Sequence, residues 1–199
     1  QRPARTAVVL TRDGMIEEIK EDADERMGKS NEVLGEMLAR IRTGRANPSL
    51  LDGITIEYYG SETPLNQVAS INVEDARTLV ISPWEKPLIP EIEKAILKSD
   101  IGITPASTSE LTRIPLPPLT EDNRKDLAKQ ARAEAENGRI AVRNIRRDAI
   151  ADVRELVKEK EVAEDEARKA EDDIQKLTDR RVAEIDQTLA AKEAELMEV

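Results

Sequence analysis

The chain has 199 residues, of which 36% are charged, a formal net charge of -10, and neither cysteine nor histidine. Disulfides, thiolate nucleophiles, imidazole bases and the usual zinc sites are therefore excluded. No apolar run approaches the roughly 20 residues that a membrane-spanning helix needs, which predicts a soluble protein. With one Trp, two Tyr and no Phe, the core must consist of Ile, Leu, Val and Ala, and this composition favours long helices.

The first fourteen residues, QRPARTAVVLTRDG, have an apolar stretch that runs only from Ala7 to Leu10. A signal-peptide core needs about 7 to 15 such residues. Helical periodicity begins only after Met15, so we expect residues 1–14 to be a disordered extension that precedes the natural start at Met15. A remnant of a transit peptide is the alternative.

After Met15 the apolar and small residues recur in steps of three and four, which is typical of an amphipathic helix with a narrow buried seam. The seam positions are Ile16, Ile19, Ala23, Met27, Ser30, Leu34, Met37 and Ile41. The stretch TGRANP ends this helix, because Gly44 can supply a C-cap and Pro48 prevents continuation. A single helix cannot bury such a seam alone, so partner helices are required.

Short strands are predicted between Ala46 and Pro118. GITIEYYG alternates like a strand, INVEDARTLVIS indicates two strands about a turn, and LTRIPLP indicates another. Pro90 is placed for the first turn of a helix that ends near Gly102, and TPASTSE indicates a loop or hairpin turn. These elements predict a small α/β unit, in which Trp84 is expected to be a packing anchor.

Two further helices follow the prolines of PLPPLT. Thr120 is a plausible N-cap for a helix that runs to about Lys160. A third helix has an apolar side formed by Ile174, Leu177, Val182, Ile185, Leu189 and Leu196. We predict an α+β protein: an antiparallel three-helix bundle, residues 15–44 plus 119–199, with an inserted α/β domain, residues 45–118. Short linkers at 43–48 and 115–119 would lie side by side and form a hinge.

The second of the long helices gathers arginines in the stretch RIAVRNIRRDA, residues 139–149. At about 100° per residue, six arginines fall within an arc of roughly 100°. We call this set the arginine stripe and expect it to exclude acids; its members are Arg132, Arg139, Arg143, Arg146, Arg147 and Arg154. An apolar arc and an acidic arc make up the rest of the helix.

Two explanations of the arginine stripe are open. Charge runs usually form solvated faces whose arginines pair with acids one turn away or on neighbouring helices. Against this, Arg143, Arg146 and Arg147 have few acids at helical pairing distance, and clustered like charges repel one another. A guanidinium grips phosphate through two parallel hydrogen bonds, which favours a polyanion. The scarcity of aromatic residues favours folded RNA, contacted through its backbone and shape, over single strands.

No other constellation indicates chemistry. The acidic stretches EDADE and EDDI are explained by solvated helix faces, since no pocket is implied. Gly44, Gly53, Gly60 and Gly102 are isolated turn residues and form no phosphate-binding loop. We therefore expect no catalytic residue, no metal site and no cofactor.

Four stretches give a more specific indication: RIRTGRANPSLLDGI, VEDARTLVI, RIPLPPLTEDNRKDL and VRNIRRDA. In this order and spacing they resemble the bacterial ribosome recycling factors, and the resemblance covers Met15 to Val199. It implies an L-shaped, tRNA-sized, non-enzymatic and monomeric cytoplasmic protein without membrane contact. Such factors bind the post-termination ribosome, contact large-subunit ribosomal RNA near an intersubunit bridge and, with elongation factor G and GTP, separate the subunits and release mRNA and tRNA.

The resemblance also assigns residues. Arg143, Arg146 and Arg147 match the RNA-contacting helix of the family, and Arg132 and Arg139 join them from the same matched region. The interdomain linkers of the family match Thr43, Gly44, Arg45, Pro117 and Pro118. An alternative of another class is a helical adaptor or chaperone whose arginines meet only acidic side chains of a protein partner.

Overall fold

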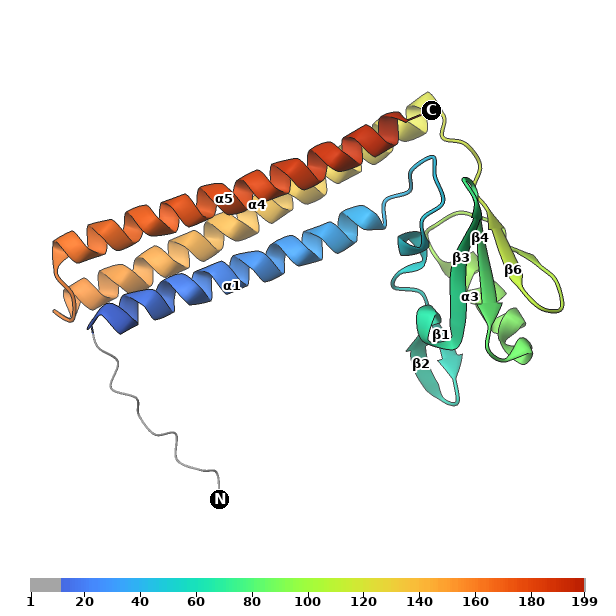
Figure 1. Ribbon diagram of the computed structural model, residues 1–199, viewed down its shortest axis with the longest axis horizontal. Coiled ribbons are helices and arrows are strands. Elements are labelled where there is room, and N and C mark those ends of the chain that lie inside the picture. The colour runs from blue at the N-terminus through green and yellow to red at the C-terminus, as the bar shows by residue number, and fades with distance from the viewer. Residues whose placement is uncertain (1–11, 199) are drawn as a thin grey trace, which may run out of the picture. The chain divides into compact units, whose positions relative to one another are not determined.

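The computed structural model describes residues 12–198 and shows the α+β fold that the sequence predicts (Figure 1). The three long helices are α1 (Arg12–Ala39), α4 (Glu121–Lys158) and α5 (Glu164–Met197). The chain splits into two compact units. The helical unit comprises the residues up to Leu34 together with Ala135–Thr188, and the mixed unit comprises Gly35–Glu134 together with the residues from Leu189 onward.

Within the helical unit, segments of all three helices bury one narrow seam. Its residues recur at intervals of three, four, seven or eleven along each helix, as expected of neighbours that pack along one side. They are Ile16, Ala23, Met27 and Leu34 of α1, Ala135, Val142, Ile145, Ala149 and Val153 of α4, and Ala167, Ala170, Ile174 and Ile185 of α5. Burial of each larger aliphatic side chain contributes about 1.5–3 kcal/mol.

The prediction for α1 was wrong at Met37, which is 43% exposed, whereas Leu38 is only 2% exposed. A step of four residues from Leu34 keeps the side chain on the same side of a helix with 3.6 residues per turn better than the predicted step of three. The helix begins at Arg12, before the expected start, and ends at Ala39, so Gly44 is not its C-cap. Residues 1–11, which belong to the disordered extension expected from the sequence, lie outside the described residues.

Side chains of α1 and α5 pack closely against α4 at Gly138. This residue is buried, and a Cβ atom there would lie 2.9 Å from Leu34 Cδ2 and 3.6 Å from Ile185 Cδ1. Glycine costs a helix interior about 1 kcal/mol relative to alanine. Because Gly138 has no side chain, Leu34 of α1 and Ile185 of α5 can pack directly against the α4 backbone.

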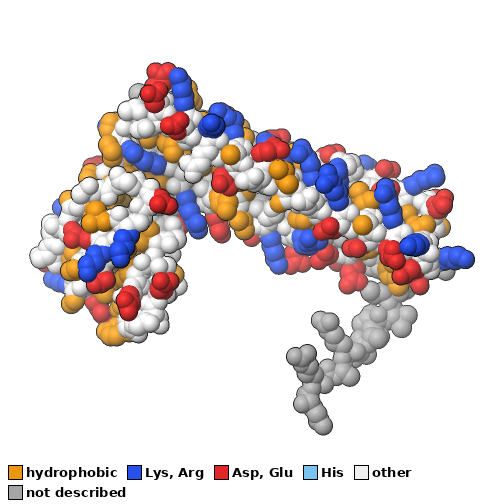
Figure 2. All heavy atoms as spheres, turned by 180° about the vertical axis from the view of Figure 1, so that it is seen from behind, with side chains coloured by type: hydrophobic (Ala, Val, Ile, Leu, Met, Phe, Trp, Pro, Cys, Tyr) orange, Lys and Arg blue, Asp and Glu red, His pale blue; other side chains and the backbone are white. Residues whose placement is uncertain are grey.

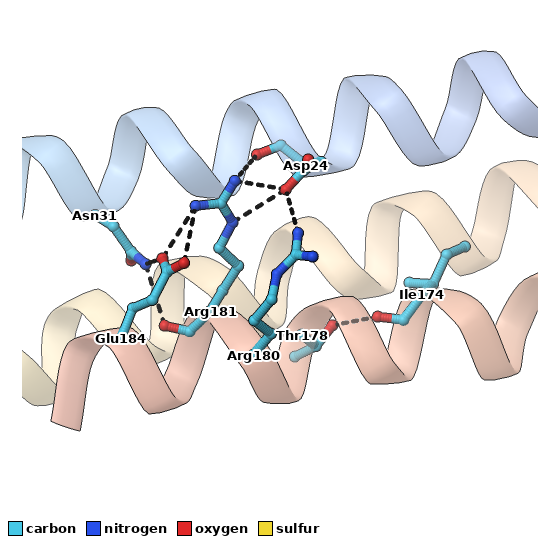
Figure 3. A network of polar contacts seen from close by, with 7 residues as sticks. All are labelled: Asp24, Asn31, Ile174, Thr178, Arg180, Arg181 and Glu184. Atoms are coloured by element: carbon cyan, nitrogen blue, oxygen red, sulfur yellow. Dashed lines mark hydrogen bonds and ion pairs between the residues drawn. The ribbon is translucent and has the colours of Figure 1, made fainter. Parts of the chain in front are cut away.

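A polar network ties α1 to α5 beside the seam (Figure 3). Arg181 donates to Asp24 Oδ1 through Nη2, at 2.5 Å, and to Glu184 Oε2 through Nη1, at 3.0 Å. Asn31 of α1 donates to the Arg181 carbonyl and to Glu184. Burial disfavours the charge of Arg181, but the hydrogen bonds to Asp24 and Glu184 outweigh it and raise the pKa of this guanidinium. The network fixes the register of α1 against α5.

The mixed unit contains two antiparallel sheets (Figure 1). One is a hairpin of β1 (Thr55–Tyr58) and β2 (Ser61–Pro64). The other has the order β3-β4-β6-β5, formed by Ala69–Asp75, Thr78–Pro83, Thr112–Pro115 and Ala106–Ser107 respectively. The predicted strands correspond to β1, β3, β4 and β6, whereas β2 was not predicted and the two-residue β5 lies in the predicted loop TPASTSE.

Short helices complete the mixed unit: α2 (Leu65–Val68), α3 (Ile89–Lys98) and the 3-10 helices Pro48–Leu51 and Lys86–Leu88. The fully buried core includes Leu79 and Ile81 of β4, Ile92 of α3 and Ile114 of β6. The alternation of β4 puts Leu79 and Ile81 on the same face of the sheet, and they share one buried core with Ile92 of α3. This packing is the α/β unit expected from the sequence.

Trp84 does not anchor this core, and that prediction was wrong. The residue follows β4 and its side chain is 68% exposed. Aliphatic side chains fill the interior without it, since the described core of this unit contains only Leu, Ile, Val and Ala. The turn assignment of three glycines is confirmed, because Gly53, Gly60 and Gly102 all have positive φ.

Gly138→Leu tests the close approach of the helices. We expect the free energy of unfolding to fall by about 1–3 kcal/mol, because the new side chain would overlap Leu34 and Ile185. Gly35→Leu is the matched control, since it lies in α1 and a Cβ atom there meets nothing within 4 Å. It should leave stability unchanged or raise it by up to about 0.8 kcal/mol. Urea unfolding of both variants measures the difference; equal effects would contradict the close approach.

Candidate functional site

The members of the arginine stripe differ in how far other side chains neutralise them. Arg139 is the most engaged: its Nη2 lies 2.6 Å from Asp186 Oδ1 of α5, and its Nη1 lies 3.1 Å from Glu136 Oε2. Its side chain is only 19% exposed. The hydrogen bond to Asp186 is the main reason that the pKa of Arg139 is raised. This arginine holds α4 to α5, so much of its charge is already compensated.

Glu136 corrects the expectation that the stripe excludes acids. At about 100° per residue this glutamate lies inside the arc of the arginines, one turn before Arg139. Its Oε1 atom also lies 3.7 Å from Arg143 Nη1, and the Arg143 side chain is 44% exposed. The contact to Arg143 is long and exposed, so it compensates that charge only weakly.

Arg146 and Arg147 pair with no carboxylate among the described residues. Arg146 Nη1 donates to the side-chain oxygen of Gln175 of α5 at 3.2 Å, and its Nε atom is buried without a partner. Arg147 is exposed and forms no hydrogen bond or ion pair within the described part of the chain. Within the described residues, the positive charge of these two guanidinium groups is therefore not compensated by a carboxylate.

Arg154 and Arg132, the outer members of the stripe, differ in how close their carboxylate partners lie. Arg154 Nε lies 2.9 Å from Glu171 Oε1 of α5. In the mixed unit, Arg132 Nη1 and Glu193 Oε1 are 4.0 Å apart, and both side chains are substantially exposed. Sequence reasoning missed Asp186, Glu171 and Gln175, because only the register between α4 and α5 reveals which residues of α5 reach the stripe.

A shallow surface hollow adjoins the uncompensated arginines in the helical unit. It is lined by Arg146, Arg147, Arg154 and Lys158, with Glu155 as the single acid and Ile150 and Ala151 as its apolar part. Glu171 compensates Arg154, but Arg146, Arg147 and Lys158 against the single Glu155 still make this hollow locally positive in an acidic chain. Over the face shown in Figure 2, basic and acidic side chains lie interspersed along the helices.

Other kinds of site find no support in residues 12–198. No cluster of three or more acidic side chains there is placed to hold a metal ion. None of the helices described combines the length and the apolarity needed to cross a bilayer. The acidic stretches EDADE and EDDI instead supply interhelical partners, because Asp24 contacts Arg181 and Asp173 contacts Lys20 at 2.7 Å. That contact is the main cause of the lowered pKa of Asp173.

The predicted hinge residues lie in two linkers that touch within the mixed unit. Arg42, next to Thr43, donates a hydrogen bond to the carbonyl of Pro117. Thr43 is buried, and its hydroxyl accepts from the Arg45 amide at 3.3 Å. Arg45 Nε lies 3.3 Å from Glu198 Oε2, and the Glu198 carbonyl is 3.8 Å from the position of a Cβ on Gly44. The prolines Pro117 and Pro118 are on the second linker.

These features define an α+β protein whose long helices bear a surface with uncompensated arginines. The sequence model described as "Ribosome recycling factor" matches residues 34–197. The chain is 57% identical to the ribosome-recycling factor of Saccharophagus degradans and 60% identical to that of Alcanivorax borkumensis, each over 93% of this chain and 100% of the relative. The chain therefore belongs to the ribosome recycling factor family.

Two solved structures are similar to the fold. A solution structure of the ribosome recycling factor has a TM-score of 0.76 at 37% identity, covering 92% of this chain and 98% of the other. A second, from models for the T. thermophilus ribosome recycling factor and the E. coli elongation factor G bound to the E. coli post-termination complex, has a TM-score of 0.66. It is 45% identical and covers 92% of this chain and 99% of the other. The resemblance found in the sequence is thus confirmed.

The difference between structural and uncompensated arginines can be tested by stability. Arg139→Gln removes the contacts to Asp186 and Glu136, and we expect the free energy of unfolding to fall by about 1 kcal/mol. Arg147→Gln removes no contact that the structure describes and should change stability by less than about 0.5 kcal/mol. Thermal unfolding of the two variants measures this. Equal destabilisation would show that Arg147 has a structural partner after all.

Proposed function

We propose that this chain binds the post-termination ribosome and, together with elongation factor G and GTP, promotes separation of the subunits. Messenger RNA and tRNA are released in this process, so that ribosomes can begin another round of translation. The proposal is supported by membership of the ribosome recycling factor family over nearly the whole chain. The observation that carries it is the pair Arg146 and Arg147, whose charges no carboxylate in the described residues compensates.

In this proposal the RNA-binding residues are Arg132, Arg139, Arg143, Arg146 and Arg147, and the ligand is large-subunit ribosomal RNA near an intersubunit bridge. The contacts described above support unequal roles. Arg146 and Arg147 bind phosphate directly, since a guanidinium without a carboxylate partner keeps donors for it. Arg139 mainly orients α4 against α5, while Arg132 and Arg143 contribute exposed but partly paired charge.

The chain acts as a translation factor, and we propose that it has no catalytic residue and no cofactor of its own. Elongation factor G supplies GTP hydrolysis, and this chain transmits the resulting force to the ribosome as a cytoplasmic monomer. The proposed domains are the bundle, residues 15–44 plus 119–199, and the α/β domain, residues 45–118. The hinge between them would consist of Thr43, Gly44, Arg45, Pro117 and Pro118, where two short linkers restrict the directions of motion.

Arg146→Glu tests the RNA contact. We expect binding to purified large subunits to weaken at least about tenfold, because a phosphate contact becomes a repulsion, while helicity and the melting temperature stay nearly unchanged. Lys29→Glu on α1 is the control, since it makes the same change in net charge at a side chain that is 71% exposed. Cosedimentation over a range of salt concentrations measures both affinity and its salt dependence.

A parent affinity that does not fall with added salt, or an Arg146→Glu variant that binds like the parent, would contradict this contact. The alternative adaptor function makes a different prediction for the same measurement. A helical adaptor for protein partners should not cosediment with the large subunit at all. An assay of subunit separation that depends on elongation factor G and GTP then distinguishes recycling from mere binding.

The hinge makes a separate prediction. Pro118→Gly frees one linker backbone, so we expect subunit separation to slow by about threefold or more while ribosome binding changes by less than about twofold. Kinetics of subunit separation at saturating factor, compared with cosedimentation, measure the two effects. Equal losses of binding and separation would contradict a hinge role for this linker.

A further inference from the structure

Gln175 interrupts a row of acids on the side of α5 that faces the arginine stripe. Glu171, Gln175 and Asp179 follow one another in steps of four residues, and Asp186 continues the same side of the helix. Glu171 and Asp186 each form a close ion pair with an arginine of α4, at 2.9 and 2.6 Å. Gln175 instead accepts a hydrogen bond from Arg146 through its side-chain amide oxygen, which carries no negative charge.

The register of the two antiparallel helices makes this amide important. The pair Arg139 and Asp186 sets the register. Arg146 follows Arg139 by seven residues along α4, and Asp179 precedes Asp186 by seven residues along α5. Asp179 is therefore the carboxylate that lies opposite Arg146. No ion pair joins them within the described residues; instead Asp179 Oδ1 accepts from Gln175 Nε2 at 2.9 Å.

The side-chain amide of Gln175 thus forms hydrogen bonds with both Asp179 and Arg146. Its nitrogen donates to Asp179, which fixes the orientation of the amide because a carboxylate can only accept. Its oxygen is then directed at Arg146, which it holds at 3.2 Å without supplying a negative charge. The Arg146 Nε atom is buried, so the aliphatic stem lies along the bundle while the guanidinium end is presented at the surface.

We propose that Gln175, oriented by Asp179, is a positioning residue that presents Arg146 to ribosomal RNA in a charged and uncompensated state. This inference rests on the proposed RNA contact of Arg146. It adds that Gln175 holds the Arg146 side chain in place before RNA binds. The residues of α5 that face Arg139, Arg146 and Arg154 give these three arginines different roles. Carboxylates convert Arg139 and Arg154 into interhelical ties, and the single amide keeps Arg146 available for phosphate.

Gln175→Glu tests the proposal, because it completes the acidic row and compensates Arg146. We expect affinity for large subunits to fall about three- to tenfold, and the slope of log affinity against log salt to shrink by about one phosphate contact. The melting temperature should change little, because the exposed ion pair gained with Arg146 is offset by the lost hydrogen bond to Asp179 and by repulsion from that carboxylate. Gln187→Glu is the matched control: the same change at an exposed α5 residue with no polar side-chain contact among the described residues.

A double-mutant cycle with Arg146→Gln separates action through Arg146 from direct repulsion of RNA. Gln175→Glu should have no further effect on affinity in that background. A full effect there, or parental affinity of Gln175→Glu alone, would overturn the positioning role. If Arg146→Gln weakens binding but Gln175→Glu does not, only the positioning role fails; if Arg146→Gln binds like the parent, the proposed RNA contact fails with it.

Discussion

The helical unit depends on how closely its three helices can approach along one narrow seam. Alanine and glycine occupy many seam positions, and at Gly138 even a methyl group would collide with Leu34. Helices this close bring the long side chains that flank the seam within reach of the neighbouring helix. Arg181 of α5 therefore meets Asp24 of α1, and Arg139 of α4 meets Asp186 of α5. The seam supplies the burial, and the flanking pairs fix the register.

That register then determines the chemistry of the surface. A helix with as many arginines as α4 could neutralise all of them, because the chain has 41 acidic residues against 31 basic ones. Which arginines have their charge compensated depends on which residues of α5 stand opposite. Arg139 and Arg154 face carboxylates, Arg146 meets an amide, and Arg147 has no described partner. The arrangement of the bundle thus selects a small set of free guanidinium groups.

Periodicity and turn residues predicted the long helices, the α/β unit, four of its strands and the start of α4, where Thr120 Oγ1 accepts from the Asn123 amide at 3.1 Å. The error at Met37 came from choosing between steps of three and four, both of which suit a helix. Trp84 was assigned by residue type, although its burial depends on tertiary packing. Glu136 was visible on the helical wheel and was overlooked. The roles of Asp186 and Gln175, by contrast, require the alignment of two helices, which the sequence pattern does not contain.

The acidic character of the chain does not conflict with binding a polyanion on α4. At physiological ionic strength the Debye length is about 8 Å, whereas a helix with its side chains is about 10–12 Å across. Acids on the opposite side of α4, such as Asp148 and Asp152, are therefore largely screened from a phosphate at Arg146 and Arg147. Glu136 is closer, but its carboxylate is engaged by Arg139 and Arg143. The acids behind the net charge of -10 act only where a polyanion comes close to them, so they disfavour other orientations, while the contact on α4 is decided by the few guanidinium groups left uncompensated.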